Sequence, residues 1–298
     1  VGLDETIDLL LAALLTRGHC LLIGVPGLAK TLLVESLAAV VNAAFNRIQF
    51  TPDLMPSDIT GSEILDFEGR KREFRFVRGP VFCNILLADE INRTPPKTQA
   101  ALLQSMQEHQ VTVSGKTWPL PDPFFVLATQ NPIEQEGTYP LPEAQLDRFM
   151  FCLTMGYPTL EQELDIITDR DRLLPGNLAK VISGKALLSL QQFLRNDYPV
   201  ADNIKEAAVR IIRQSRPESS TLATVKKHVS WGAGPRAGVF FLHAAKAIAA
   251  LQGKPAPDLD DLRKAALPVL RHRIILNYAG EAEGLDPDTL AAAILETV

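Results

Sequence analysis

The chain has 298 residues, 46% of them hydrophobic and 22% charged, and carries a formal net charge of −5 with a pI of about 5.6. These proportions are typical of globular domains, and the acidic balance disfavours a protein that binds nucleic acid through a broad positive field. No apolar run approaches the ~18–20 residues of a membrane span, and the acidic start VGLDETID does not resemble a secretory signal, so we expect a cytoplasmic protein. Cys20, Cys83 and Cys152 lie far apart without metal-ligand spacing, which predicts buried, reduced thiols.

Three apolar runs in the first half predict buried strands, with helical patterns between them. The runs stop at a glycine, at two acidic residues and at polar residues before a proline, as is typical of buried parallel strands. The predicted strands span 19–24, 84–90 and 123–132, and the predicted helices span 30–42 and 94–109. This alternation favours an α/β fold, with a mostly parallel sheet covered by helices on both faces.

Two further segments of the first half show the pattern of β-hairpins. In 62–82, apolar and polar residues alternate on both sides of a turn at Glu68 and Gly69. In 110–120, a similar alternation flanks a Ser-Gly pair. Both segments therefore predict hairpin inserts in the α/β pattern.

After Gly156 and Pro158 the pattern becomes helical, and strand-like runs are absent. We expect two domains, an αβα core at 1–156 that contains the hairpins and an all-helical domain at 157–298. The predicted helices of the second domain span 160–174, 184–196, 203–216, 235–252, 259–275 and 286–298.

The stretch GVPGLAKT joins the first strand to the first helix and is close to the phosphate-binding pattern G-x-x-x-x-G-K-[ST]. In such a loop, backbone N–H groups point at phosphate, Lys30 can reach the outer phosphates and Thr31 can offer its hydroxyl to Mg²⁺. Ala29 stands where the pattern has glycine. We expect a negative φ there, with Gly24 and Gly27 meeting the special demands of the loop. The alternative is an ordinary tight turn with an exposed lysine. The candidate phosphate-binding residues are Gly24, Val25, Pro26, Gly27, Leu28, Ala29, Lys30 and Thr31.

Polar residues end the second and third predicted strands, at the edge of the sheet where ligands bind in open α/β folds. In LLADE, Asp89 can hold Mg²⁺ and Glu90 can polarise an attacking water. In TQNP, Asn131 can hold that water or the terminal phosphate without adding charge. A solvated strand end for the two acids and a simple turn for Asn131 are the structural alternatives.

Two arginines complete the candidate site. Arg148, in EAQLDRF, is a candidate arginine finger, inserted into the site of a neighbouring subunit. The structural alternative is a surface ion pair. Arg236, in GAGPRAG, lies in the first turn of a long apolar helix. A cation is unfavourable at a helix N-terminus, so we expect a nucleotide phosphate to offset that cost.

These five pieces, in this order, resemble the AAA+ ATPases, in which the loop is Walker A, LLADE is Walker B and Asn131 is sensor 1. Arg148 then matches the arginine finger and Arg236 matches sensor 2. The segments GVPGLAKT, LLADEINR, ATQNP, LPEAQLDRF and GAGPRA resemble more narrowly the MoxR group, of which Ala29 is the mark. That group has an insert in the second core helix and a hairpin before sensor 1, where the two hairpins are predicted. Where the family has an upstream Gly-Gln pair that helps to enclose adenine, this chain has Gly2 followed by Leu3.

The resemblance implies a P-loop AAA+ core with a helical lid at 157–298 and a ring-forming, usually hexameric, Mg²⁺-dependent ATPase whose sites are shared between subunits. It further implies chaperone-like action on a protein client, in some cases with a von Willebrand factor A domain partner.

Two other functions stay open from the sequence. One is a motor that acts on nucleic acid, supported by Arg70, Lys71 and Arg72 in the first hairpin; acidic composition argues against it. The other is a scaffold that binds ATP but hydrolyses it weakly, which the intact set of Glu90, Asn131 and Arg148 disfavours.

Overall fold

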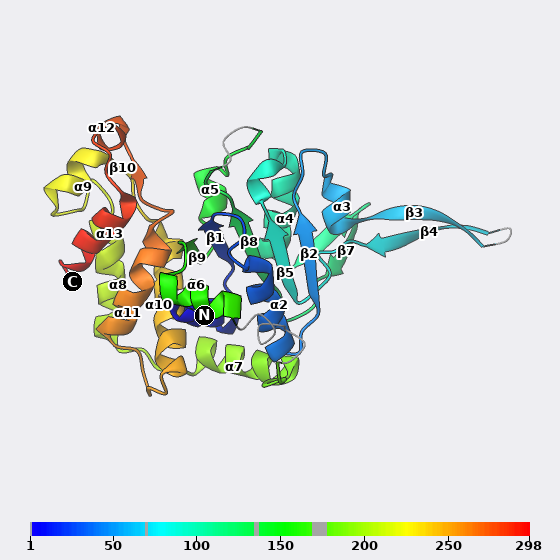
Figure 1. The fold of residues 1–298 in the computed structure, drawn as a ribbon, viewed down its shortest axis with the longest axis horizontal. Coiled ribbons are helices and arrows are strands. Elements are labelled where there is room, and N and C mark those ends of the chain that lie inside the picture. The colour runs from blue at the N-terminus through cyan, green and yellow to red at the C-terminus, as the bar shows by residue number, and fades with distance from the viewer. Residues whose placement is uncertain (1, 69–70, 134–136, 169–177) are drawn as a thin grey trace. The chain divides into compact units, whose positions relative to one another are not determined.

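The computed structural model describes residues 2–68, 71–133, 137–168 and 178–298, and these form two compact units (Figure 1). The first, which we call the sheet unit, is built mainly from Leu21–Leu141 and Thr154–Leu188. The second, the helical unit, combines Leu3–Cys20, Pro142–Leu153 and Ser189–Val298. Each unit therefore brings together segments that are far apart in the chain.

The sheet unit is organised around a five-stranded sheet with the order β2-β5-β8-β1-β9. The pairs β2–β5 and β5–β8 are parallel. The predicted strands are confirmed as β1 (Cys20–Gly24), β5 (Ile85–Asp89) and β8 (Phe125–Gln130). The sequence pattern does not predict β2 (Phe45–Gln49) or β9 (Phe151–Met155). In β2 only Ile48 is buried, so this edge strand lacks the apolar run that reveals the central ones.

Helices flank the strands as predicted, with small shifts at their ends. The segment 30–42 forms α2 (Lys30–Val40), and the segment 94–109 forms α4 (Pro96–Glu108). The other described helices of the sheet unit are α3 (Pro56–Thr60), η1 (Ile91–Arg93) and α6 (Leu160–Thr168), and α7 (Gly184–Asn196) runs from this unit into the helical unit.

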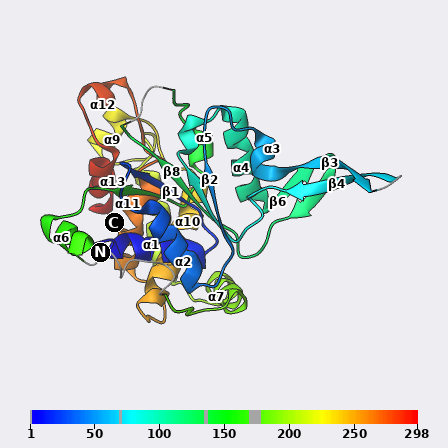
Figure 2. The ribbon, with the colours of Figure 1, turned by 45° about the vertical axis from the view of Figure 1, so that its right-hand side comes forward.

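Both predicted hairpins are confirmed. In the first, β3 (Gly61–Glu68) pairs with β4 (Lys71–Arg78), and Gly69 and Arg70 lie outside the described residues, as do the side chains of Lys71 and Arg72. In the second, β6 (Gln110–Val113) pairs with β7 (Lys116–Pro119). The β3–β4 hairpin projects away from the sheet in both views (Figure 1, Figure 2).

The two hairpins contact each other through aromatic rings. The rings of Phe76 and Trp118 stack with their centroids 4.8 Å apart, and Phe82 packs edge-on against Phe76 at 5.7 Å. Lys116 and Glu63 add an ion pair at 3.6 Å. The base of the first hairpin is thus held by the second.

The helical unit is centred on α10 (Pro235–Leu251), which packs against three other helices of the unit, α1, α8 and α11. Alanines bring these helices close, because Ala237, Ala244, Ala245 and Ala247 are fully buried. The remaining described helices of this unit are α1 (Asp4–Leu15), α5 (Glu143–Leu146), α8 (Asp202–Gln214), α9 (Ala223–His228), α11 (Leu259–Leu270), α12 (Tyr278–Ala282) and α13 (Pro287–Leu295).

The expectation that the second half lacks strands is wrong in one detail. β10 (Val229–Trp231) pairs antiparallel with β11 (Ile275–Leu276). Strands of two or three residues are too short to leave a periodic pattern in the sequence, which is why the helical pattern hides them.

Each compact unit of the structure is built from several segments, so the packing does not divide the chain at a single boundary near residue 157. The helical unit includes Leu3–Cys20 and Pro142–Leu153, and the sheet unit extends to Leu188. The domains 1–156 and 157–298 therefore stay a prediction. None of the described helices is both long enough and apolar enough to span a membrane.

Candidate active site

The loop after β1 places Lys30 at the start of α2, within electrostatic reach of two acids. Lys30 Nζ donates a hydrogen bond to the carbonyl oxygen of Gly24. Burial lowers the pKa of the Lys30 ammonium, and the carboxylates of Asp89 and Glu90 act in the opposite direction. Lys30 and the two acids, which follow it by 59 and 60 residues in the chain, therefore share one site at the carboxyl ends of β1 and β5.

The expected negative φ at Ala29 is wrong. Ala29 has φ +55° and ψ 28°, in the left-handed region, as the N-cap of α2. The chain has to reverse sharply between the loop and the helix, and this residue makes the reversal. Gly27 is also left-handed, with φ +86°, as expected, but Gly24 is not among the positive-φ glycines. Gly24 packs closely against Met155 instead, because a Cβ at position 24 would lie 3.1 Å from the Cβ of Met155 and would need a small shift of that residue.

The single substitutions Gly27→Ala and Ala29→Gly are expected to affect the free energy of unfolding differently. Gly27→Ala should lower the free energy of unfolding by about 1–2 kcal/mol, because a side chain disfavours the left-handed conformation. Ala29→Gly should leave it unchanged or raise it by up to about 1 kcal/mol, since relief of strain is partly offset by the greater freedom of glycine in the unfolded chain. Urea unfolding midpoints measure both. A larger loss for Ala29→Gly than for Gly27→Ala would contradict the left-handed loop.

Asp89 is held on both carboxylate oxygens. Thr129, fully buried on the neighbouring strand β8, donates its hydroxyl to Oδ1 at 2.6 Å. Arg47, on β2, donates from Nη2 to Oδ2 at 2.6 Å. The carboxylate is thereby fixed at the sheet edge, and a metal ion at Asp89 would compete with the Arg47 guanidinium for Oδ2.

Glu90 lies one residue beyond β5 in a left-handed conformation, with φ +57°. Its backbone N–H donates to the Thr129 hydroxyl at 2.9 Å. Its Oε2 accepts hydrogen bonds from Gln49 Nε2 at 2.7 Å and from Arg93 Nη1 at 3.0 Å. Among the described residues no hydrogen bond reaches Oε1, so that oxygen can accept a proton from a water molecule.

Asn131 follows β8 and is almost completely buried. Its Oδ1 accepts the backbone N–H of Ile133 at 3.2 Å, so the side chain does form the local turn that was the structural alternative. Within the described part of the chain, its Nδ2 has no hydrogen-bond partner. This donor can therefore still hold a water or phosphate oxygen next to the edge that carries Glu90.

A nucleotide-bound Mg²⁺ fits this donor set. Among the residues that the structure describes, no group of three or more His, Cys, Asp or Glu side chains could hold a metal ion alone. Mg²⁺ in nucleotide sites takes most of its ligands from phosphates and water, and needs only one or two from the protein. The hydroxyl of Thr31 and the carboxylate of Asp89 are oxygen donors of the kind required.

Sequence reasoning missed four residues that organise the two acids. Arg47 and Gln49 lie on one face of β2, Arg93 lies on η1 and Thr129 is the residue two places before Asn131. The period-2 spacing of Arg47 and Gln49 could have placed them on one face, but only the pairing of β2 with β5 brings that face to Asp89 and Glu90.

The two predicted arginines belong to the helical unit. Arg236 Nη1 pairs with Asp147 Oδ2 at 3.2 Å, so Asp147 supplies the negative charge that we expected from a phosphate. The chain turns just beyond α5 at Arg148, which forms no ion pair within the described residues. The surface ion pair considered for Arg148 is therefore absent there, and its neighbour Asp147 binds other arginines.

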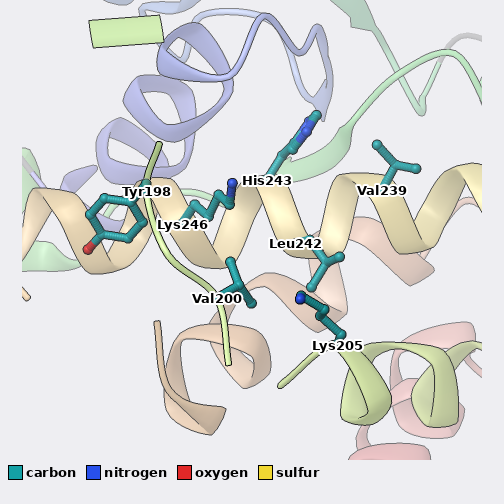
Figure 3. Close-up of a pocket in the computed structure, with 7 residues that line it drawn as sticks. All are labelled: Tyr198, Val200, Lys205, Val239, Leu242, His243 and Lys246. Carbon is teal, nitrogen blue, oxygen red and sulfur yellow. The ribbon is translucent and has the colours of Figure 1, made fainter. Parts of the chain in front are cut away.

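The helical unit also holds a pocket of about 310 Å³ between α8 and α10, lined by Tyr198, Val200, Lys205, Val239, Leu242, His243 and Lys246. The ring of His243 and the side chain of Leu242 project from opposite sides of α10, and the hydroxyl of Tyr198 points away from both (Figure 3). That hydroxyl donates to the Lys254 carbonyl at 2.5 Å. Burial and the charges of Lys246 and Arg195 lower the pKa of His243 to about 4, so the ring is neutral at pH 7.

The three cysteines are free and buried, as predicted. Burial raises the pKa of Cys83 to about 12 and that of Cys152 to about 11. Thiols with so high a pKa are protonated at neutral pH and are therefore weak nucleophiles.

A phosphate-binding loop follows β1, two acids stand at the end of β5 and an amide follows β8, on neighbouring strands of an αβα sheet. This arrangement defines a P-loop fold of the AAA+ type with an added helical unit. Comparisons agree. Residues 19–151 match the family described as "ATPase family associated with various cellular activities (AAA)", and residues 222–296 match the AAA lid domain.

Relatives that match the whole of this chain show which group of AAA+ ATPases it belongs to. The whole chain is 45% identical to Chaperone MoxR1 of Mycobacterium tuberculosis, covering 78% of that protein, and 45% identical to protein YeaC of Bacillus subtilis, covering 90%. It is 29% identical to Protein MoxR of Methylorubrum extorquens, covering 91%. The crystal structure of a candidate ATPase from Cytophaga hutchinsonii matches with a TM-score of 0.91 and 42% identity, over 100% of this chain and 90% of that one. The chain belongs to the MoxR family of AAA+ ATPases.

Proposed function

We propose that the protein hydrolyses ATP with Mg²⁺ in a ring of several copies, and uses the energy to remodel a protein client. The observation that carries the proposal is the placement of Lys30 within electrostatic reach of Asp89 and Glu90, with Asn131 on the adjacent strand end. A lysine between two carboxylates could be a purely structural ion cluster. The loop that carries the lysine has the phosphate-binding pattern, however, and this favours a nucleotide site.

Each residue at the sheet edge has a distinct role in this proposal. The loop amides and Lys30 hold the phosphates, while Thr31 and Asp89 hold Mg²⁺, which neutralises charge on the phosphates when bound. Glu90 Oε1 accepts a proton from the attacking water. Asn131 Nδ2 orients that water.

The remaining roles fall to the two arginines, and that of Arg148 needs a second subunit. Arg236 would contact the phosphates of its own subunit, and Arg148 would reach the site of the next subunit to stabilise the transition state. A closed hexameric ring provides every site with one such arginine. Both assignments rest on the family resemblance and on the position of the two arginines next to Asp147.

The first hairpin favours a protein client over nucleic acid. Four apolar side chains of β3 and β4 are well exposed: Ile64, Leu65, Phe74 and Val77, the third of them 69% exposed. Leu65 and Phe74 are direct cross-strand partners, so they form one apolar surface. Such a surface suits apolar segments of another protein. The relative named Chaperone MoxR1 supports a chaperone-like role. A von Willebrand factor A domain partner is proposed from the family resemblance alone.

Lys30→Ala tests the nucleotide site directly. It is expected to weaken the binding of Mg²⁺-ATP by at least about tenfold, because the charge-assisted contact to the outer phosphates is lost. Isothermal titration with ATP measures the change. Lys97→Ala, which removes an exposed lysine from α4 in the same unit, is the matched control and should bind as wild type does. Equal affinities of the two variants would rule out phosphate binding by this loop.

A further inference from the structure

Gln99 lies in the first turn of α4 and is fully buried beside the loop that follows Glu90. Its Nε2 donates to three backbone carbonyl oxygens, those of Ile91 at 3.2 Å, Thr94 at 3.1 Å and Tyr139 at 3.0 Å. The amide has two hydrogens for three acceptors, so one hydrogen is shared between two of them. All of these residues belong to the sheet unit. A single side chain of α4 thus binds both the loop after β5 and the segment that contains Tyr139.

The orientation of the Gln99 amide is set by these acceptors. In the flipped orientation Oε1 would face three carbonyl oxygens, and no hydrogen bond would form. Within the described residues Oε1 is buried without a hydrogen-bond partner, which is unfavourable by itself. The side chain therefore acts through its N–H groups, which bind the three carbonyls.

The loop that Gln99 binds begins with a strained residue. Glu90 has φ +57°, and the left-handed region is unfavourable for a residue that carries a side chain. Such a conformation persists only where the surrounding structure imposes it. The Glu90 N–H donates to the Thr129 hydroxyl at 2.9 Å, and the Glu90 carbonyl accepts the N–H of Arg93 at 2.9 Å. The second contact lies within the loop, so it can hold Glu90 only if the loop itself is held.

Gln99 and Tyr139 hold the rest of the loop from outside. Gln99 binds the carbonyls of Ile91 and Thr94. The Tyr139 N–H donates to the carbonyl of Asn92 at 2.6 Å, and its own carbonyl accepts from Gln99. Ile91 and Thr94 are completely buried, so loss of the amide would remove hydrogen bonds that water cannot replace. The loop would then rearrange to pair these carbonyls, beginning at the residue next to Glu90.

We propose that Gln99 is a positioning residue for ATP hydrolysis, which fixes the loop after β5 so that Glu90 keeps the backbone conformation from which its carboxylate meets the attacking water. This inference rests on the proposed function, in which Glu90 is the general base. Gln99 acts through the backbone of Ile91 and has no part in the chemistry itself.

Gln99→Met tests the proposal, because methionine has a similar unbranched shape but no N–H donor. It is expected to lower kcat for ATP hydrolysis by about 10–100-fold, the effect of a small misplacement of a catalytic group. KM and the affinity for ATP should stay within about threefold of wild type, since the phosphate-binding loop is untouched. A wild-type kcat, or a loss of ATP binding equal to the loss of kcat, would overturn the proposal.

Thr98→Val is the matched control. Thr98 is the neighbouring residue of α4, is only 3% exposed, and donates its hydroxyl to the carbonyl of Leu54 at 2.9 Å. The substitution therefore also removes a buried hydrogen bond between α4 and a backbone carbonyl, but one outside the loop after β5. It should keep the wild-type kcat. An equal fall of kcat in both variants would show a general effect of weakened packing and would overturn the proposal.

A double substitution separates positioning from loss of structure. In the Glu90→Gln background, Gln99→Met should lower the residual hydrolysis by less than about twofold, because there is no general base left to misplace. Single-turnover measurements at saturating ATP give these residual rates. The same fold-loss in both backgrounds would overturn the proposal.

Hydrogen exchange provides a readout that does not depend on activity. The amide hydrogens of Arg93 and Tyr139, which donate to the carbonyls of Glu90 and Asn92, should exchange faster in Gln99→Met than in wild type. In Thr98→Val they should exchange at the wild-type rate. Unchanged exchange in Gln99→Met would show that the loop does not depend on Gln99 and would overturn the proposal.

Folding of each variant is checked by thermal unfolding. If Gln99→Met does not fold, Gln99→Asn replaces it, because asparagine keeps the buried amide but is one methylene too short to reach all three carbonyls. Its expected results have the same direction, and failure of both variants to fold would make Gln99 a purely structural residue. Failure of the proposed function looks different: Glu90→Gln itself would then hydrolyse ATP at the wild-type rate.

Discussion

Replacing Glu90 by glutamine is expected to lower kcat for ATP hydrolysis by about 10³-fold while ATP affinity stays within about threefold of wild type. Glutamine has nearly the shape of glutamate and can still accept from Gln49 and Arg93, which donate to Oε2 at 2.7 and 3.0 Å. It cannot take a proton from water. Phosphate release at saturating ATP and titration calorimetry measure the two quantities separately.

Glu108→Gln is the control for this change. Glu108 ends α4 in the same unit and is exposed, so removing its charge should alter neither quantity. An active Glu90→Gln protein would exclude Glu90 as the general base. Loss of ATP binding together with hydrolysis would instead indicate that Glu90 stabilises the loop, since its carboxylate lies within electrostatic reach of Lys30.

Removing the guanidinium in Arg148→Ala is expected to reduce hydrolysis by about 10³-fold or more, the usual contribution of an arginine finger, with ATP affinity little changed. Arg148 has no ion pair among the described residues, so the substitution should cost little stability. If Arg148 acts on the next subunit, mixing this variant with Glu90→Gln in equal amounts should restore activity at roughly a quarter of the sites, since each needs one subunit of each kind.

The control for Arg148→Ala is Arg210→Ala, which removes an exposed arginine from α8 and should leave hydrolysis intact. An inactive mixture of Arg148→Ala and Glu90→Gln subunits, shown by mass to have assembled together, would place the action of Arg148 within its own subunit. Full activity of Arg148→Ala alone would remove it from the mechanism.

The sequence predicts the central part of the fold well because buried strands there appear as continuous apolar runs in the chain. β1, β5 and β8 are apolar runs that end in glycine or in polar residues. Both hairpins are recognised by alternating apolar and polar residues on either side of turn residues. β2 carries mostly polar side chains, and β10 and β11 are too short to produce a period. Elements of this kind are defined by their partners in space.

The candidate site divides in the same way. Lys30, Asp89 and Glu90 are predictable because the chemistry demands those residue types at strand ends. Partners that are distant in the chain are not predictable: Arg47 reaches Asp89 across 42 residues, and in the helical unit Arg273 reaches Asp147 across 126. Ala29 shows a third kind of limit, since residue type alone leaves the sign of φ open, and the geometry of the loop decides it.

The interleaved composition of the helical unit has a consequence for how the chain folds during synthesis. α1 leaves the ribosome early, but α10, on which it packs, is complete only when residue 251 has emerged. The segment that carries Arg148 waits still longer, until Arg271–Arg273 are made. The sheet unit can close its strands first, because they come from the first 155 residues. The apolar face of α1 is therefore exposed until α10 has been made, and the segment that carries Arg148 is set in place only after Arg271–Arg273 have been made.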